Sequence, residues 1–452
     1  MKKDFIKKPL SALLMASMLA LPVSTSADIV ATEENYSKED IIETNEDKVL
    51  QQSLENNLNK TGNKYPIVFV HGLMGWGDNE LLGWHYWGGF NSLRDILTKS
   101  GYEVYMPSIS PVSSNWDRAC ELYAYLKGGT VDYGEAHSKK QGHARYGATY
   151  PGVLPKLGTY GEDGEILKIH LFGHSMGGQT SRVLAELLEN GAQEEVAATG
   201  QDTSPLFTGG KHWIDSITTL CTPHDGSSEA AAQNKFEPNV HRFVAAIAAA
   251  AGFKDINKFF SYSLKLDQWG LKQEKDESFS DYLKRVFNSN IWKETKDLSI
   301  WDLVPEGAED INKWATNKDD IYYFSIACSD THKSLIKGYQ VPNINMHPLM
   351  LGSAFTIGHY TQSGENKVLI DKSWWENDGL VSVVSAIGPH VGSKDKVVDY
   401  DGTPEKGEWN YLGKISNIDH LQVIFQNEPL YTKVLQNRYK NWCKMLWNLD
   451  SF

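Results

Sequence analysis

The sequence has no long apolar run beyond its first residues, no cluster of basic residues and little cysteine. No stretch of 18 apolar residues follows the N-terminal region, so nothing predicts a membrane-spanning helix in the mature chain. The formal net charge is −13, and Lys and Arg form no block. This balance argues against nucleic acid and anionic lipid surfaces as partners and leaves neutral substrates open.

Cysteine is scarce, with four residues in a chain of 452. An even number in an exported chain permits three disulfide pairings. The four are widely spaced in apolar or helical contexts, and a core of this size needs no covalent cross-links. We therefore favour buried free thiols over disulfides for Cys120, Cys221, Cys328 and Cys443.

The N-terminus has the pattern of a secretory signal peptide. Four lysines precede an apolar segment from Leu10 to Val23, and small residues follow, which predicts cleavage after Ala27. An uncleaved membrane anchor is the alternative, but the apolar segment is short for spanning. Residues 28–63 are polar and acidic, and we expect a disordered leader or short pro-segment before a domain covering 64–452.

The rest of the chain is globular in composition, with 41% hydrophobic and 11% aromatic residues. Strand-like runs such as "KYPIVFVHG", "EILKIHLFG" and "WIDSITTLCTP" alternate with helical ones such as "GGQTSRVLAELLENG". The C-terminal stretch "EPLYTKVLQNRYKNWCKMLWNL" has the apolar spacing of a helix. The alternation predicts an α/β fold with a mostly parallel sheet and helices on both faces.

The most informative motif is "GHSMG", residues 173–177, between a predicted strand and a predicted helix. This is the G-x-S-x-G context of a nucleophile elbow, in which a tight turn exposes the hydroxyl of Ser175. The glycines are needed because neighbouring backbone approaches too closely for side chains. The N-terminus of the following helix directs free N–H groups toward a developing oxyanion.

A serine nucleophile needs a general base and an orienting acid. In folds with a nucleophile elbow these follow the serine along the chain, first Asp or Glu and then His. "WWENDGLVS" offers Asp378 and "SNIDHLQV" offers His420. Read alone, Asp378 is also a turn residue before glycine, and His420 also an ordinary loop histidine. The oxyanion hole needs two backbone donors, which we assign to the N–H groups of Leu73 and Met176.

Two histidines lie six positions apart in the polar segment "VDYGEAHSKKQGHARYG". His137 and His143 are ordinary surface residues, metal ligands or part of a catalytic site, and their spacing alone does not decide between these. The triad candidates elsewhere remove the need for catalysis here.

The motifs "VHGLMGWG", "GHSMGGQT", "NDGLVS" and "DHL", in this order, resemble those of the staphylococcal and thermophilic-bacillus true lipases. The resemblance runs from about Tyr65 to the C-terminus. It implies a secreted triacylglycerol lipase of the α/β-hydrolase fold that acts at an oil–water interface.

The resemblance also implies a small zinc-binding insert at about 112–147. Its ligands are two aspartates and two histidines, which match Asp117, His137, His143 and Asp267 here. Four such ligands suit a closed, structural zinc site, although oxygen and nitrogen ligands without thiolate also accept other divalent ions.

A family calcium site near the catalytic histidine is altered in this chain. A glutamate ligand is replaced by Gln422, and an Asp-Pro pair by Asn427-Glu428-Pro429. Loss of a charged ligand predicts weak calcium binding or none.

Residues 230–266 contain an apolar, alanine-rich helical stripe. It is either a buried core helix or, as the resemblance implies, a lid that opens at a lipid surface.

The main hypothesis is thus a secreted serine hydrolase of triacylglycerols or similar esters. A carboxylesterase for short soluble or polymeric esters is the nearest alternative. A zinc metallohydrolase using His137 and His143, and a non-catalytic lipid-binding protein, are the more distant ones.

Overall fold

The structure is a computed structural model that describes residues 45–56, 62–78, 80–81, 83–162, 164–232, 262–335, 337–426 and 432–450. The predicted signal peptide and much of the predicted leader lie outside these ranges. So do residues 233–261, which make up most of the predicted lid segment.

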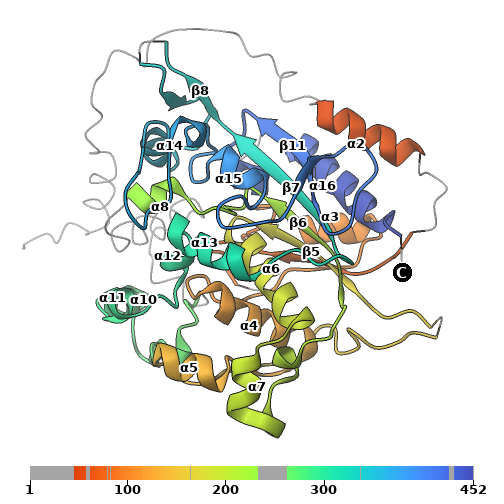
Figure 1. Cartoon of the computed structure of the whole chain (residues 1–452), viewed down its shortest axis with the longest axis vertical. Helices are drawn as coiled ribbons and strands as arrows, with labels where there is room; N and C mark the ends of the chain where they lie inside the picture. The colour runs from red at the N-terminus through yellow and green to blue at the C-terminus, as the bar shows by residue number, and fades with distance from the viewer. Residues whose placement is uncertain are drawn as a thin grey trace, which may run out of the picture.

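One seven-stranded sheet forms the centre of the described chain, and every neighbouring pair of strands in it is parallel. The strand order is β10-β11-β7-β6-β5-β1-β2, and Figure 1 labels β11, β7, β6 and β5 of this sheet. The strands are β1 (Ile67–Val70), β2 (Val104–Tyr105), β5 (Ile169–His174), β6 (Ile214–Leu220), β7 (Tyr322–Ser329), β10 (Val397–Asp399) and β11 (Trp409–Ser416). Because all run in one direction, the loops after the strands meet at one edge, where sites in open α/β sheets form.

Alternating residues of the strands enter two different cores, one on each face of the sheet. In β1, Ile67 and Phe69 pack with the first core, and Val68 and Val70 with the second. The first core also contains residues of α2 (Asn45–Asn56), α3 (Leu93–Lys99), α10 (Phe279–Phe287) and α16 (Thr432–Trp447). The second contains residues of α4 (Asn115–Lys127), α6 (Met176–Glu189) and α13 (Pro305–Trp314). Helices on both faces explain why the strands are continuously apolar.

Helix α2 corrects the expectation of a disordered leader for residues 45–56. Leu50 and Leu54 lie one helical turn apart and are buried in the first core. Arg438 of α16 donates to Asp47, and Ser53 donates to the carbonyl of Gly402. The polar composition of this segment does not predict a packed helix. Two apolar residues on one face are nevertheless enough to attach it to the domain.

The predicted metal-binding insert is built from a hairpin and a short helix. Strands β3 (Gly129–Asp132) and β4 (Tyr146–Tyr150) pair antiparallel, and α5 (Glu135–Gln141) lies between them in the sequence. A second antiparallel pair, β8 (Thr331–Lys333) and β9 (Gln340–Pro342), follows β7. The remaining α-helices are α7 (Gln193–Thr199), α8 (Ser228–Ala232), α11 (Ile291–Glu294), α12 (Ser299–Asp302), α14 (Leu351–Ile357) and α15 (Val383–Ile387).

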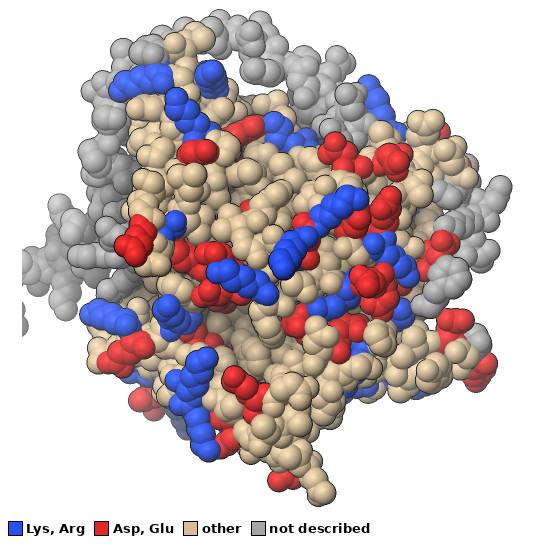
Figure 2. Space-filling model, in the orientation of Figure 1, with Lys and Arg blue, Asp and Glu red and all other residues tan. Residues whose placement is uncertain are grey.

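All four cysteines are buried and free, which confirms the prediction of free thiols. None of the helices in the described ranges is both long and apolar enough to cross a lipid bilayer. On the face shown in Figure 2, acidic and basic side chains are interspersed.

Candidate active site and metal cluster

Ser175 lies at a sharp turn between β5 and α6. Its backbone has φ 57° and ψ −133°, a conformation that L-residues rarely adopt and that often marks functional positions. A Cβ added to Gly177 would lie 2.1 Å from the carbonyl oxygen of Val70, and one added to Gly173 would lie 2.4 Å from the nitrogen of Gly178. The tight turn therefore requires both glycines of the motif, as the sequence predicted.

The structure brings Asp378 and His420 together at the carboxyl edge of the sheet. Nδ1 of His420 donates to Oδ2 of Asp378 over 2.7 Å, and the other carboxylate oxygen accepts from the N–H groups of Leu380 and Val381. Both side chains are buried. The His420 ring lies 4.5 Å, centroid to centroid, from that of His174, the residue before Ser175. Because Nδ1 carries the proton, Nε2 of the neutral imidazole is free to accept one.

His174 connects three loops of this site through its two ring nitrogens. Nε2 lies 3.1 Å from the carbonyl oxygen of His420, so this nitrogen is the donor. Nδ1 then accepts from the Tyr86 hydroxyl at 2.6 Å, and that hydroxyl accepts from the N–H of Gly72 at 2.9 Å. Burial holds the pKa of His174 well below its usual range, which keeps the ring neutral. The hydrogen bonds therefore all run in one direction, from Gly72 through Tyr86 and His174 to His420. No sequence signal indicates this role, because the G-x-S-x-G motif treats position 174 as variable.

The loop after β1 lies directly against the serine. A Cβ on Gly72, the residue before Leu73, would come within 2.7 Å of the Ser175 Cβ. Among the described residues, neither the N–H of Leu73 nor that of Met176 is paired with a turn or loop carbonyl. Met176 is the first residue of α6, so its N–H has no partner within the helix. Both N–H groups are available to an oxyanion.

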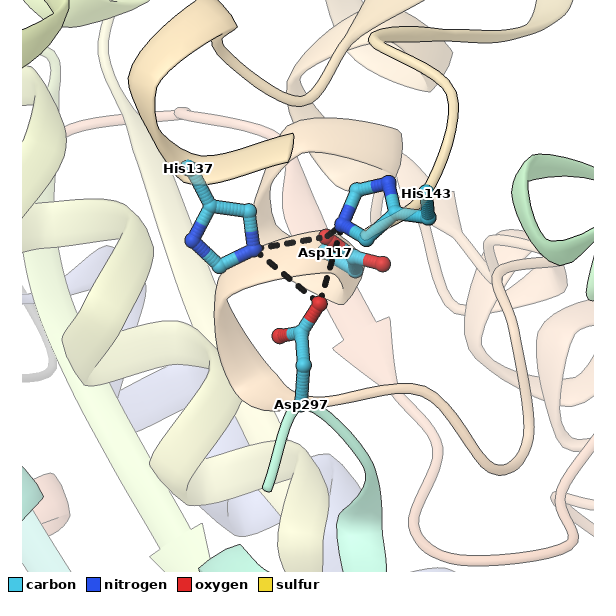
Figure 3. Close-up of side chains that lie close together, drawn as sticks. All are labelled: Asp117, His137, His143 and Asp297. Atoms are coloured by element: carbon cyan, nitrogen blue, oxygen red, sulfur yellow. Dashed lines mark hydrogen bonds and ion pairs between the residues drawn. The ribbon is translucent and has the colours of Figure 1, made fainter. Parts of the chain in front are cut away.

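Four potential metal ligands converge at a second place, away from the serine (Figure 3). Asp117 belongs to α4, His137 to α5, His143 to the loop after α5, and Asp297 to the segment before α12. Nε2 of His137 lies 3.4 Å from Asp117 Oδ1 and 3.1 Å from Asp297 Oδ2. Nε2 of His143 lies 3.9 and 3.0 Å from the same two oxygens. Ligands of a tetrahedral zinc ion are about 3.3 Å apart, so these separations fit such an ion.

The chemistry of the four groups also fits a cation. Nδ1 of His143 donates to the carbonyl of Ala144 at 2.8 Å, which leaves the lone pair of Nε2 directed at the carboxylates. This Nε2 and Oδ1 of Asp117 are buried without a hydrogen-bond partner. Burial opposes the charged form of His137, but hydrogen bonds that its ring donates to Asp117 and Asp297 outweigh burial and raise the pKa of that imidazole to about 10. The cluster thus favours positive charge at its centre.

The structure corrects one predicted ligand. Asp267 does not reach the cluster: its side chain is 39% exposed and lies 3.9 Å from Nζ of Lys272. Its neighbour Gln268 points inward instead and donates from Nε2 to Oδ2 of Asp117 at 2.8 Å. Asp297 is instead the fourth member of the group that could hold a metal ion. The predicted segment is adjacent to the cluster, but the turn Asp267–Trp269 directs the glutamine, not the aspartate, toward it.

The position of the predicted calcium glutamate is filled by an amide with two hydrogen bonds. Oε1 of Gln422 accepts from the N–H of Asp419 at 3.0 Å, and Nε2 donates to the carbonyl of Asn345 at 2.8 Å. Both ends of the side chain are therefore occupied by protein groups, and the amide carries no charge for calcium. The Asn-Glu-Pro sequence expected to complete the site lies in 427–431, outside the described residues.

Two buried residues were not indicated by any sequence motif: Arg118, near Ser175, and Asp297, in the metal cluster. Arg118, on α4, donates from Nε to Thr180 of α6 at 2.9 Å and also to the carbonyl of His71, so it joins α6 to the loop after β1. Asp297 lies 180 residues after Asp117, with no spacing pattern to indicate it. An acidic residue before the apolar run "LSIW" is the one available signal.

Comparison with known proteins gives consistent matches. The family model described as "Lipase-like, C-terminal domain" matches residues 63–449. "Lipase 2" of Staphylococcus aureus is 40% identical over 370 residues, covering 80% of this chain and 50% of that protein. The chain thus spans about half the length of the curated relatives it matches.

Two solved structures are similar over most of their length. EstA from Clostridium botulinum superposes with a TM-score of 0.80 at 40% identity, covering 92% of this chain and 99% of that one. Lipase 1 from Pelosinus fermentans superposes with a TM-score of 0.78 at 46% identity, covering 86% and 99%.

Proposed function

The chain belongs to the lipase-like family whose model it matches and has the α/β-hydrolase fold of its structural relatives, and on this premise we propose that it is a secreted serine hydrolase of triacylglycerols or similar water-insoluble esters. The observation that carries the proposal is the Asp378–His420 hydrogen bond beside the strained turn of Ser175. A hydroxyl next to an oriented imidazole suits acyl transfer.

Each residue then has a defined role in ester cleavage. Oγ of Ser175 attacks the ester carbonyl carbon while Nε2 of His420 takes the hydroxyl proton. The negative carbonyl oxygen is stabilised by the N–H groups of Leu73 and Met176. His420 returns the proton to the departing alcohol, and a water molecule activated by the same imidazole releases the carboxylic acid. Asp378 fixes the tautomer of His420 and stabilises the imidazolium.

Exposed apolar side chains in and beside the hairpin that follows β7 support a water-insoluble substrate. Leu335 and Ile344, in and beside the β8–β9 hairpin, are 92% and 98% exposed. Met346 and Met350 of the following segment are buried against Leu380, two residues after Asp378, and Leu421, the residue after His420. Exposed apolar side chains such as Leu335 and Ile344 are typical of contact with lipid or with another protein.

We further propose that Asp117, His137, His143 and Asp297 hold a structural Zn²⁺. Four protein ligands close the coordination sphere, so the bound ion supplies a cross-link between elements and no open position for substrate. Calcium is not expected to contribute, because Gln422 offers an amide in hydrogen bonds and no charge.

The test of the catalytic proposal is the Ser175→Ala variant with tributyrin and triolein. We expect kcat to fall about 10⁶-fold, because the acyl-enzyme can no longer form. A fluorophosphonate should label the wild-type protein on Ser175 and leave the variant unlabelled. Retention of most activity in Ser175→Ala would favour a metallohydrolase, and absence of labelling would favour a non-catalytic lipid-binding protein.

The substrate class is tested by varying substrate concentration through its solubility limit. A lipase should show a rise in rate when an emulsion forms. A rate that is saturated below that limit, with no rise above it, would instead indicate a carboxylesterase for soluble esters.

A further inference from the structure

A third group of ionisable side chains lies at the opposite edge of the sheet from the triad. Glu189 is the last residue of α6, His212 lies two residues before β6, and Asp320 lies two residues before β7. Because β6 and β7 are parallel, their starts lie at the same edge, and Glu189 at the end of α6 contacts His212 there. The three residues are separate from the ligands of the first cluster.

The geometry of the group does not suit a simple ion pair. Nδ1 of His212 lies 2.7 Å from Oε2 of Glu189 and 3.0 Å from Oδ2 of Asp320. One imidazole nitrogen carries at most one proton, so it cannot donate fully to two carboxylates. These separations are close to the spacing of about 3.3 Å between ligands of a four-coordinate zinc ion, and the three ligand atoms lie within 4.8 Å of one another.

Glu189 provides an independent indication that a cation belongs there. Its side chain is 7% exposed, and its second oxygen, Oε1, is buried without a hydrogen-bond partner. Burial and the nearby Asp320 raise the pKa of Glu189 to about 7, although His212, Lys318 and Lys168 oppose this. Nζ of Lys318 is paired with Glu186, a turn earlier in α6. An unpaired buried carboxylate oxygen is costly unless a proton or a metal ion neutralises it.

We propose that Glu189, His212 and Asp320 form a second divalent-cation site of the zinc type. One imidazole and two carboxylates are ligands that suit zinc better than calcium or magnesium, which prefer oxygen alone. His212 is 62% exposed on its side chain, so a water molecule completes the coordination from solvent. Such an ion joins the end of the nucleophile helix to the starts of two central strands.

The test is zinc stoichiometry by calorimetry, confirmed by elemental analysis, on the full chain without a histidine tag. The wild-type protein should bind two zinc ions. His212→Ala should bind one, and so should Asp297→Ala, which removes a ligand of the other cluster. His359→Ala replaces an exposed histidine outside both groups and should still bind two. Circular dichroism establishes that each variant is folded.

Two results would overturn the proposal: a wild-type protein that binds a single zinc ion, or a His212→Ala variant that binds as much zinc as His359→Ala. The readout is binding, so it is independent of the ester-hydrolase proposal. Zinc titration should also raise the Tm of Asp297→Ala, in which the second site alone remains, and should leave the Tm of the double variant Asp297→Ala/His212→Ala unchanged.

Discussion

Glu121 is a buried carboxyl on α4 whose charge state depends on pH in the neutral range. It accepts hydrogen bonds from the N–H of Ser110 and the hydroxyl of Tyr133. Burial raises its pKa from the ordinary 4.5 to about 7, although the positive charge of Lys265 acts in the opposite direction. The folded protein therefore binds a proton at Glu121 more tightly than the unfolded chain does.

The stability contributed by this protonated carboxyl is fully present below pH 4.5 and is lost as the pH rises through about 7. Ionising Glu121 in the folded protein costs roughly 3 kcal/mol more free energy than ionising it in the unfolded chain. Glu121→Gln retains an acceptor for Ser110 and carries no charge, so its Tm relative to wild type should be higher at pH 8 than at pH 5. Thermal melts at both pH values measure the difference.

Glu365→Gln, at an exposed carboxyl, is the matched control and should show no such trend. If the Tm difference between Glu121→Gln and wild type is the same at pH 5 and pH 8, Glu121 does not titrate between them.

Among the structural elements, the loop that carries His420 has the clearest departure from the family pattern. Gln422 begins the short 3₁₀ helix Gln422–Ile424 and attaches this loop to the segment of Asn345 by a neutral hydrogen bond. Where relatives were expected to use a charged ligand and an ion, this chain uses a side-chain amide. The loop of His420, the proposed general base, is thus held in place by hydrogen bonds within the protein.

We expect wild-type activity and Tm to be the same in calcium-depleted and calcium-containing buffers, both supplemented with zinc. Gln422→Glu should lower stability by about 1–3 kcal/mol without calcium, because a carboxylate would face the Asn345 carbonyl with no donor between them. Millimolar calcium should recover part of that loss. A wild-type protein that loses activity on calcium removal would contradict this account; Gln422→Ala, which offers no ligand, should not respond to calcium.

At the scale of the whole molecule, the first metal cluster joins parts of the chain that are far apart in sequence. The proposed zinc ligands come from α4, the insert and the segment before α12, so four side chains spread between positions 117 and 297 meet at one point. A closed site of this kind stabilises the folded state and has little direct effect on chemistry at Ser175.

Asp297→Ala should lower the Tm in zinc-containing buffer, with a loss on the order of 3 kcal/mol if zinc exceeds its dissociation constant by about 100-fold. Asp267→Ala should have a Tm close to wild type, because that side chain lies outside the cluster. For the wild-type protein, chelation should lower the Tm before turnover at 25 °C is abolished. A larger effect of Asp267→Ala than of Asp297→Ala would restore the original ligand assignment.

The sequence was informative where a function depends on local pattern. Alternating strands and helices predicted the parallel sheet, and G-x-S-x-G with its chain order predicted the turn at Ser175 and the pairing of Asp378 with His420. The resemblance located three of the four clustered ligands. It also identified the segment of Asp267, which lies beside the cluster.

The sequence-based predictions that were wrong or missing concern contacts that form only in the folded chain. Asp297 is separated from its partners by more than 150 residues, and a one-residue difference in a turn decides whether Asp267 or Gln268 faces inward. Helix α2 was missed because its composition is polar and its attachment depends on Leu50 and Leu54. The role of His174 follows from tautomers and three loops, which no motif encodes.

The burial of all four thiols gives the folded protein an intrinsic chemical reporter. Burial raises the pKa of Cys120, Cys221, Cys328 and Cys443, so none offers an accessible thiolate in the native state. Alkylating reagents therefore react only with molecules that have opened, and the cysteine that reacts identifies the region that opened. An added surface cysteine would be modified without background, which permits a fluorophore to be placed at a chosen position on the native protein.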